Sequence, residues 1–283
     1  MNVTDRIEKI TSVYKTLPKA WAIALFGSRA RGTATEKSDI NIMVVQSEMA
    51  SQSARAQILS ILADPDKPSI CREQPIPADY FYSDNVPISI WHIPEDVICE
   101  RVSDVVRNKP LKYPLIVSIL HTSKILWDPK MQLEAWKNVI SPIPLEYKQT
   151  VIPVLFSGVT NGLEIMDRHS DVSSTFFSHH EQGEVIKVLY EIIFLANDSY
   201  IIFSPHLDRE INKLKNIPEG FLKHIQAILS LGSDPEGLQA RWRRLCHLVQ
   251  IVGNFLEELG LYNLKSGWTQ LRKTAPFLFD FED

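Results

Sequence analysis

The sequence predicts an α+β fold: an N-terminal domain with a mixed sheet flanked by helices, followed by an all-α helical bundle domain. Up to about residue 93, short apolar runs bounded by glycine or proline alternate with helical patterns. Beyond about residue 145 the patterns are helical throughout. A chain of 283 residues, 45% hydrophobic and 23% charged, is globular and long enough for one large or two medium domains.

The first elements are a helix and two buried strands. Thr4 is a suitable helix N-cap and Pro18 ends the pattern. Between them, apolar side chains recur at near-helical spacing: Ile7, Ile10, Tyr14 and Leu17. Residues 21–26 (WAIALF) form a continuous apolar run, and residues 39–45 form a second one. The sequence therefore predicts a helix that leads into two neighbouring strands.

A helix and a hairpin come next. Residues 52–63 carry apolar side chains on one helical face and are followed by the turn cluster DPDKP. Residues 80–82 and 86–93 flank a turn signal at 83–85, which favours a hairpin. Its second arm would be a third strand of the same sheet.

The rest of the chain is predicted to be helical. Residues 94–140 contain three helical patterns, one of which covers 113–127. Four long helical segments follow, over residues 146–166, 183–197, 219–231 and 236–261. Pro142 and Pro144 interrupt the pattern between these parts, so we expect domains at 1–142 and 143–283.

Composition limits the classes of partner. The net charge is -4 and the pI is near 6.1, so the chain lacks the basic field that drives nucleic-acid binding, and a small substrate is favoured. Its three cysteines, Cys71, Cys99 and Cys246, lack the spacing of a disulfide framework or a zinc site. A cytoplasmic protein with no membrane partner is expected, because signal-peptide and membrane-spanning patterns are absent. The oligomeric state is not indicated.

The most informative stretch is GSRARGTATEKSDINIMVV, residues 27–45. Gly27 permits a tight turn and a close approach of the backbone to a phosphate, and Ser28 offers a hydroxyl and an amide. Arg31, with Arg29 as a second candidate, would add charge-assisted contacts to phosphate oxygens. Ser38 would cap the turn into the next strand. These residues predict a phosphate-binding turn.

Asp39 and Asn41 follow on the strand. Positions i and i+2 of a strand project to the same face, so both side chains would face one pocket. Transfer of a nucleotidyl group needs carboxylates that hold metal ions against a triphosphate. An amide contributes a neutral oxygen to such a site, where a second carboxylate would contribute a charge.

Together these elements resemble the nucleotidyltransferase superfamily whose fold is shared with DNA polymerase β, with the order and spacing of its GSxARG and SDxDxxV motifs. The resemblance implies an N-terminal nucleotidyltransferase domain that uses Mg²⁺ and ATP or another nucleoside triphosphate. It assigns Asp39 and Asn41 as catalytic residues, Gly27, Ser28, Arg31 and Ser38 as triphosphate-binding residues, and Asp39, Asn41 and Ser89 as metal ligands.

Two carboxylates are missing from this pattern. Asn41 stands where the family usually has a second aspartate, and Ser89 stands where the resemblance places a third acid on a later strand. Asp79 and Asp84 are alternatives for that acid, although a turn and a strand entrance account for both. Weak Mg²⁺ binding and impaired activity are therefore expected.

The layout is similar to that of the small-molecule nucleotidyltransferases that adenylylate aminoglycosides and lincosamides. Their helical domain helps to bind the acceptor, and in some an acid on that domain is the general base. Glu181, Glu184 and Glu191 are the candidates here, although such residues on a charged helix are more often solvated. The predicted function is transfer of AMP from ATP to a hydroxyl group of a small molecule.

Two other functions stay open. The first is a catalytically degenerate nucleotide-binding or interaction protein, indicated by Asn41 and Ser89. The second is a helical-domain ribonuclease of HEPN type paired with a nucleotidyltransferase domain, because Arg241 and His247 resemble its Rx4-6H pattern. An ordinary amphipathic helix is favoured for these two residues.

Two further patterns are a histidine-rich segment and a tryptophan beside the predicted site. The histidines and acids at Asp167, His169, Asp171, His179, His180 and Glu181 match no established metal motif, and a polar loop accounts for them. Trp91 is a candidate for stacking on a base. The sequence contains neither a P-loop nor a dinucleotide-binding glycine motif.

Overall fold

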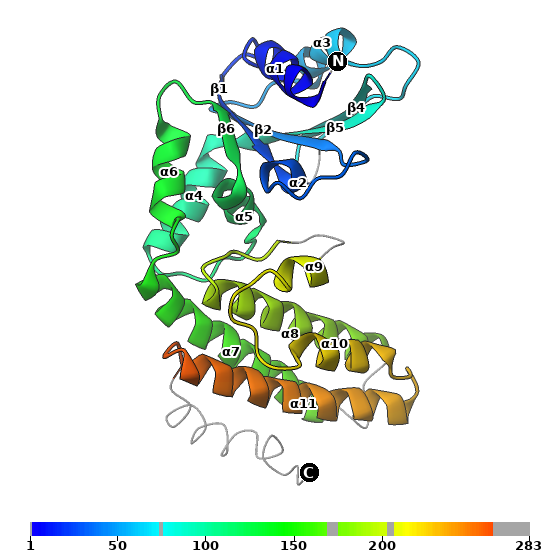
Figure 1. The fold of residues 1–283 in the computed structure, drawn as a ribbon, viewed down its shortest axis with the longest axis vertical. Helices are drawn as coiled ribbons and strands as arrows, with labels where there is room; N and C mark the ends of the chain where they lie inside the picture. Colours follow the sequence, from blue (N-terminus) through cyan, green and yellow to red (C-terminus); the bar gives the residue numbers. More distant parts are fainter. Residues whose placement is uncertain (1, 74–75, 169–174, 203–206, 263–283) are drawn as a thin grey trace. The chain divides into compact units, whose positions relative to one another are not determined.

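The computed structural model describes residues 2–73, 76–168, 175–202 and 207–262 (Figure 1). The chain divides into two compact units. Unit 1 comprises Met1–Val106 and Tyr113–Pro142, and unit 2 comprises Arg107–Lys112 and the chain from Ile143 onward. Among the described helices, none is both long and apolar enough to span a membrane.

Unit 1 is built on a six-stranded sheet with the order β3-β4-β5-β2-β1-β6. The strands are β1 Ala20–Phe26, β2 Ile40–Gln46, β3 Ile70–Arg72, β4 Ala78–Ser83, β5 Val86–Pro94 and β6 Lys124–Trp127. The β2–β5 pair is parallel and the other neighbours are antiparallel. This mixed sheet with helices, followed by a helical C-terminal region, confirms the predicted α+β class.

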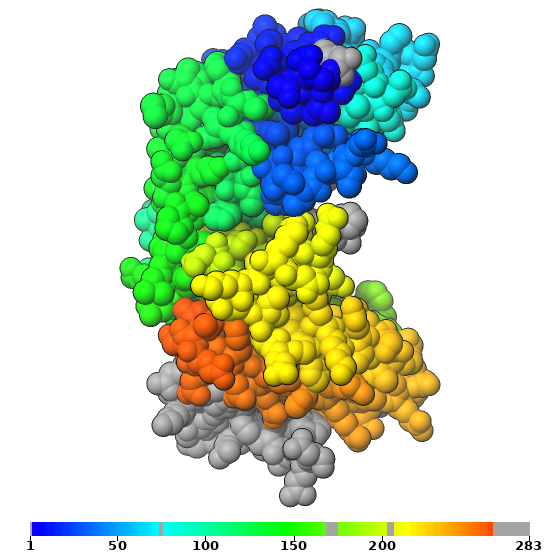
Figure 2. All heavy atoms as spheres, viewed as in Figure 1, coloured from blue at the N-terminus to red at the C-terminus, as the bar shows by residue number. Residues whose placement is uncertain are grey.

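Six helices belong to unit 1: α1 Val3–Tyr14, α2 Gly27–Ala30, α3 Gln52–Leu62, α4 Glu95–Val106, α5 Leu115–Thr122 and α6 Gln132–Ile140. Helices α1 and α3 cover one face of the sheet, and α2 and α5 lie on the other (Figure 1). Residues of α1 and of the segment from α3 to β4 lie side by side on the surface of the unit (Figure 2). Ile40 and Ile42 enter the core under α1 and α3, so the alternation of a strand turns Asn41 to the opposite face.

The β4–β5 hairpin turns at Asp84 and Asn85, whose φ angles are 47° and 61°. Two central residues with positive φ are typical of the tight hairpin turn that suits the twist of the strands. The Asp64 carboxylate accepts hydrogen bonds from the backbone N–H groups of Asp84 at 2.8 Å and Asn85 at 2.9 Å. The turn therefore fixes the register between β4 and β5.

Several sequence-based elements differ in the structure: α8, Thr175–Ala196, begins well before the predicted residue 183, and α9, Leu207–Ile211, was not predicted. Asn2 caps the first helix, since its Oδ1 accepts from the Asp5 N–H at 2.9 Å, and Thr4 lies inside the helix. Residues 113–127 were predicted as one helix, but the helix ends at Thr122 and β6 follows, paired with the edge of β1. The short strand β3 was not predicted because partners distant in the sequence create it.

After Pro142, all the secondary-structure elements that the structure describes are helices. They are α7 Leu145–Arg168, α8 Thr175–Ala196, α9 Leu207–Ile211, α10 Phe221–Ser230 and α11 Pro235–Glu258. Helices α7, α8 and α11 pack against one another. Their fully buried side chains include Phe156, Leu163, Leu189, Ile192, Leu245 and Val249. Unit 2 therefore has a helical core of its own.

Candidate active site

One row of side chains crosses five strands on the face opposite α1 and α3. Phe26 of β1 is the register partner of Asn41 on β2, and Asn41 is the partner of Ser89 on β5. Ser89 pairs in turn with Tyr80 on β4, and Tyr80 with Ile70 on β3. Neighbouring strands lie about 4.8 Å apart, so Asn41 and Ser89 are adjacent. The fold thus brings together two predicted site residues that lie far apart in the sequence.

Asp39 and Asn41 make a direct contact at the entrance to β2. The Asn41 Nδ2 group donates a hydrogen bond to Asp39 Oδ1 at 2.9 Å. Asp39 is exposed and Asn41 is half-buried. The amide therefore partly compensates the aspartate charge, which a second carboxylate would instead repel.

Ser89 is held by the indole of Trp91. Its side-chain oxygen accepts from Trp91 Nε1 at 3.0 Å, and Ser89 is only 7% exposed. Trp91 packs edge-on against Phe26, with ring centroids 5.3 Å apart. Because the Ser89 oxygen accepts this bond, its hydroxyl proton remains able to donate to a ligand.

The glycine turn lies directly against Asn41. Gly27 has φ +75°, and a Cβ atom at this position would lie 2.9 Å from Asn41 Nδ2. Helix α2 begins at Gly27 and has four residues, which include Ser28. The Ser28 carbonyl accepts from the Thr33 N–H at 2.9 Å and so folds the following loop back onto the turn. Both the φ angle and the contact require glycine here.

Arg29 and Ser38 brace the loop between α2 and β2. Arg29 Nε donates to the Asp39 carbonyl at 2.9 Å, and Arg29 Nη2 donates to the Ser38 carbonyl. The Ser38 hydroxyl oxygen accepts from the Thr35 N–H at 2.8 Å. Arg31, in contrast, keeps a buried Nε with no hydrogen-bond partner among the described residues. Arg29 is therefore engaged with the backbone of the loop, whereas Arg31 Nε is not.

A cavity of about 460 Å³ opens over the row. Its lining includes Asp39, Asn41, Ser89, Trp91, Tyr80 and Tyr82. Asp39 is the only carboxylate among the residues that line it. Within the described part of the chain, no group of three or more His, Cys, Asp or Glu side chains is placed to hold a metal ion.

Neither alternative for the third acid reaches this cavity. Asp79 is the register partner of Ile90 and faces the opposite side of the sheet, where it is fully buried. Asp84 lies in the hairpin turn and pairs with Arg6 at 3.1 Å. Neither aspartate of the hairpin therefore joins Asp39 in this cavity.

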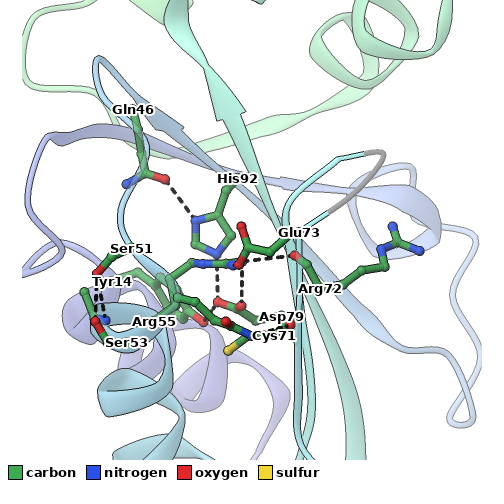
Figure 3. Close-up of polar contacts among 12 residues, drawn as sticks. Tyr14, Gln46, Ser51, Ser53, Arg55, Cys71, Arg72, Glu73, Asp79 and His92 are labelled. Atoms are coloured by element: carbon green, nitrogen blue, oxygen red, sulfur yellow. Dashed lines mark hydrogen bonds and ion pairs between the residues drawn. The ribbon is translucent and has the colours of Figure 1, made fainter.

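Asp79 is instead the centre of a buried polar cluster (Figure 3). Its carboxylate accepts from Arg55 at 3.0 Å, from Tyr14 at 3.0 Å and from His92 Nε2 at 2.7 Å. His92 Nδ1 lies 3.0 Å from Gln46 Oε1. Burial alone would raise the pKa of Asp79, but the hydrogen bond and charge of His92 and the charge of Arg55 outweigh it and lower that pKa. The sequence signal for this cluster was His92, a titratable residue within the largely apolar run of β5.

The three candidate bases all lie on α8 and differ in burial. Glu191 is only 7% exposed, and burial raises its pKa to about 7 against the opposing charge of Lys187. Glu184 is exposed and pairs with Lys187 at 2.7 Å. Glu181 is half-buried. Of the three, Glu191 is the most deeply buried.

Arg241 and His247 do not form a joint site. The Arg241 guanidinium donates to the Leu231 carbonyl, with Nε at 3.1 Å, and lies 3.0 Å from His179 Nδ1. His247 is exposed and packs on His224, with ring centroids 5.2 Å apart. Two residues six positions apart on an α-helix point about 120° apart around its axis, so the side chains of Arg241 and His247 diverge. The ribonuclease hypothesis loses its structural basis.

Two histidines of the segment considered as a metal site, His179 and His180, contact other side chains. His179 contacts Arg241, and the ring of His180 stacks on Phe176 with centroids 6.4 Å apart. His169 and Asp171 lie outside the described residues. The described histidines are therefore engaged in packing and in a contact with a cation.

One family model matches the part of the chain that contains the glycine turn and β2. Residues 8–70 match the family model described as polymerase beta, nucleotidyltransferase. A comparison with curated protein sequences finds no significant match. The family match covers β1, the glycine turn and β2, and it confirms the resemblance to the nucleotidyltransferase superfamily.

Among solved structures, a nucleotidyltransferase-like protein from Exiguobacterium sibiricum 255-15 is similar at 13% identity and TM-score 0.45, with 99% of this chain and 90% of that chain covered. Spectinomycin adenyltransferase AAD(9) from Enterococcus faecialis, crystallised with ATP and spectinomycin, has 13% identity and TM-score 0.29, over 89% and 99%. The polymerase core of TRAMP, an RNA surveillance complex, has 12% identity and TM-score 0.29, over 87% and 56%. With TM-scores below 0.5, these likenesses support neither a substrate nor a mechanism.

Proposed function

We propose that this protein transfers a nucleoside monophosphate, AMP from ATP, to a hydroxyl group of a small molecule. One observation carries the proposal: the glycine turn of the matched family segment lies in contact with Asn41, which is paired with Ser89 on one sheet face. On this proposal the triphosphate lies at the β1 end of the row, and the β4 end is left for an acceptor.

The donor would be held by the turn. Ser28 offers its amide and hydroxyl, and the Arg31 guanidinium offers donors that match phosphate oxygens. Displacement at the α-phosphate requires the acceptor hydroxyl and the leaving pyrophosphate on opposite sides of the phosphorus atom. The cavity on the far side of Asn41 and Ser89 is the space in which an acceptor hydroxyl would lie.

The residues present fit one divalent ion. Asp39 offers a carboxylate, Asn41 an amide carbonyl and Ser89 a hydroxyl, and Mg²⁺ commonly takes one or two carboxylates together with substrate phosphates. A bound ion would offset charge on the phosphate oxygens. A two-metal arrangement needs more carboxylates than this cavity contains. Asp39 is thus the single charged ligand on which the proposed activity depends.

A degenerate nucleotide-binding protein is the second candidate function. The observation that favours it is the hydrogen bond from Asn41 Nδ2 to Asp39 Oδ1, which satisfies the aspartate without a metal. This candidate predicts ATP binding that is weak or independent of metal, with no transfer.

Release of pyrophosphate from ATP separates the two candidates. If the protein transfers AMP, pyrophosphate release should depend on Mg²⁺ or Mn²⁺ and on an acceptor. The Asp39→Asn variant should then release no pyrophosphate. Asn41→Asp combined with Ser89→Asp should strengthen Mn²⁺ binding measured by calorimetry, since two carboxylates are added. Absence of release with every acceptor, together with metal-independent ATP binding, would support the second candidate.

A further inference from the structure

The β4 end of the cavity has an aromatic wall. Tyr80 is paired with Ser89 and Tyr82 with Pro87, so both tyrosines line the same face as the candidate site residues. Tyr80, Tyr82 and Trp91 line the cavity and are all half-buried, so part of each residue remains exposed. Ile70, 60% exposed on the edge strand, extends the wall beyond Tyr80. A planar ring would find apolar stacking surfaces here.

Two cations lie over this wall. Arg72 Cζ is 5.3 Å from the centre of the Tyr80 ring, and Lys67 Nζ is 5.8 Å from the centre of the Tyr82 ring. Arg72 is two residues after Ile70 on β3, so it belongs to the cavity face, and Figure 3 shows its side chain pointing away from the Asp79 cluster. Cations held over aromatic rings remain able to meet an anion at their outer side.

The charges of the cavity are divided between its ends. Asp39, the only carboxylate among the lining residues, is at the β2 end, whereas the two lining tyrosines at the β4 end, Tyr80 and Tyr82, have Arg72 and Lys67 over their rings. Tyr80 and Asn41 are two strand spacings apart, about 10 Å. A polycationic acceptor placed at the β4 end would meet two cations and no carboxylate that lines the cavity, whereas an anionic ring would meet complementary charge.

We propose that the β4 end, defined by Tyr80, Tyr82, Arg72 and Lys67, binds a small aromatic ring that carries an anionic group. This ligand is the acceptor or part of it, an assignment that rests on the proposed function. The glycine turn lies at the opposite end of the same row, next to Phe26. Donor and ring-anion ligand therefore occupy separate ends on either side of Asn41 and Ser89.

Calorimetry on the full chain tests this binding without requiring catalysis. The probes are uridine 5′-monophosphate and indole-3-acetate as ring anions, uridine and indole as matched uncharged rings, and an aminoglycoside as the polycation. At least one ring anion should bind about tenfold more tightly than its uncharged partner and than the aminoglycoside. The two ring anions distinguish a phosphate from a carboxylate as the anionic group.

Variants assign the binding to the wall. Tyr80→Leu should weaken ring-anion binding by at least about fivefold, since a stacking ring is lost, whereas Tyr80→Phe keeps the ring and should bind normally. Arg72→Gln should reduce the preference for the anion over the uncharged ring. Lys9→Gln removes an exposed cation from α1, on the other sheet face, and should change nothing.

Equal affinity for charged and uncharged rings would overturn the assignment, as would tightest binding of the aminoglycoside. So would unchanged ring-anion binding in both Tyr80→Leu and Arg72→Gln. A fourth contrary result is loss of ring-anion binding when a nonhydrolysable ATP analogue saturates the protein. The last would make the wall a site for the donor base. Failure of the proposed function has a different signature, namely ring-anion binding without pyrophosphate release.

Discussion

Asn41 donates a hydrogen bond to Asp39, a contact that a carboxylate at position 41 would not make. Asn41→Asp should therefore cost about 1 kcal/mol of stability without metal, because a favourable bond becomes a repulsion at a largely exposed site. Thermal unfolding should show a lower Tm that MnCl₂ restores. Asn41→Ala, which loses the bond but adds no charge, should not respond to MnCl₂. A variant as stable as the native chain without metal would contradict this.

Gly27 and Gly32 form a matched pair for testing the turn. Both have positive φ, +75° and +71°, but only at Gly27 would a Cβ atom meet a neighbour, Asn41 Nδ2 at 2.9 Å. Each alanine variant should lose about 1 kcal/mol of unfolding free energy through its backbone conformation. Only Gly27→Ala should also weaken ATP binding, measured by calorimetry, since it displaces Asn41. Equal effects of the two variants on ATP binding would refute the contact.

Glu191 gives a pH dependence of stability. Its pKa is raised to about 7 in the folded protein, chiefly by burial. A raised carboxyl pKa contributes stability that is complete below the unfolded value near 4.3 and is lost as the pH rises through about 7. Denaturant unfolding should show stability falling by about 1 to 3 kcal/mol over this window. Glu191→Gln should remove the decline, and a decline that persists would mean that another group causes it.

At the scale of elements, the Asp79 cluster joins α1, α3, β2, β4 and β5 (Figure 3). Asp79→Ala would leave the buried Arg55 without its fully buried partner, which typically costs about 3 to 5 kcal/mol. Denaturant unfolding should report this loss. Asp66→Ala, at an exposed position of the same unit, should cost about 0.5 kcal/mol or less. Comparable losses in the two variants would show that the cluster is not stabilising.

The same carboxylate has the opposite pH dependence to Glu191. Its folded pKa is lowered, so its contribution is present above the unfolded value near 3.9 and is lost as the pH falls through the folded value. Unfolding curves between about pH 5 and pH 2 should therefore converge for the native chain and Asp79→Asn. A constant difference over that range would exclude Asp79 as the titrating group.

The elements that the sequence predicted are those with a complete local signal. The apolar runs of β1 and β2 and the turn at Asp84 and Asn85 are encoded by residues next to one another. Strands β3 and β6 were missed because each is short and exists through pairing with an edge of the sheet.

The candidate site divides in the same way. Asp39, Asn41 and the glycine turn could be predicted from one motif, whereas the adjacency of Asn41 to Ser89 follows from a parallel pairing between distant strands. The aromatic wall and the burial of Asp79 depend on which face of β4 turns inward, and one residue of register decides that.

At the scale of the whole molecule, the chain passes between the two units three times, after Val106, Lys112 and Pro142. Each unit nevertheless has its own buried core, with Ile42 and Ile90 fully buried in unit 1 and Leu245 and Val249 in unit 2. Separate cores are expected to open separately in native-state hydrogen exchange.

This organisation predicts that destabilisation stays within a unit. Asp79→Ala in unit 1 and Leu245→Ala in unit 2, at a fully buried position, should each accelerate amide exchange in their own unit only. In the double variant, the two losses of unfolding free energy should add to within about 0.5 kcal/mol, as they do for independent sites. Faster exchange in α7, α8 and α11 of the Asp79→Ala variant would show instead that the two cores unfold as one, because the altered cluster belongs to unit 1 alone.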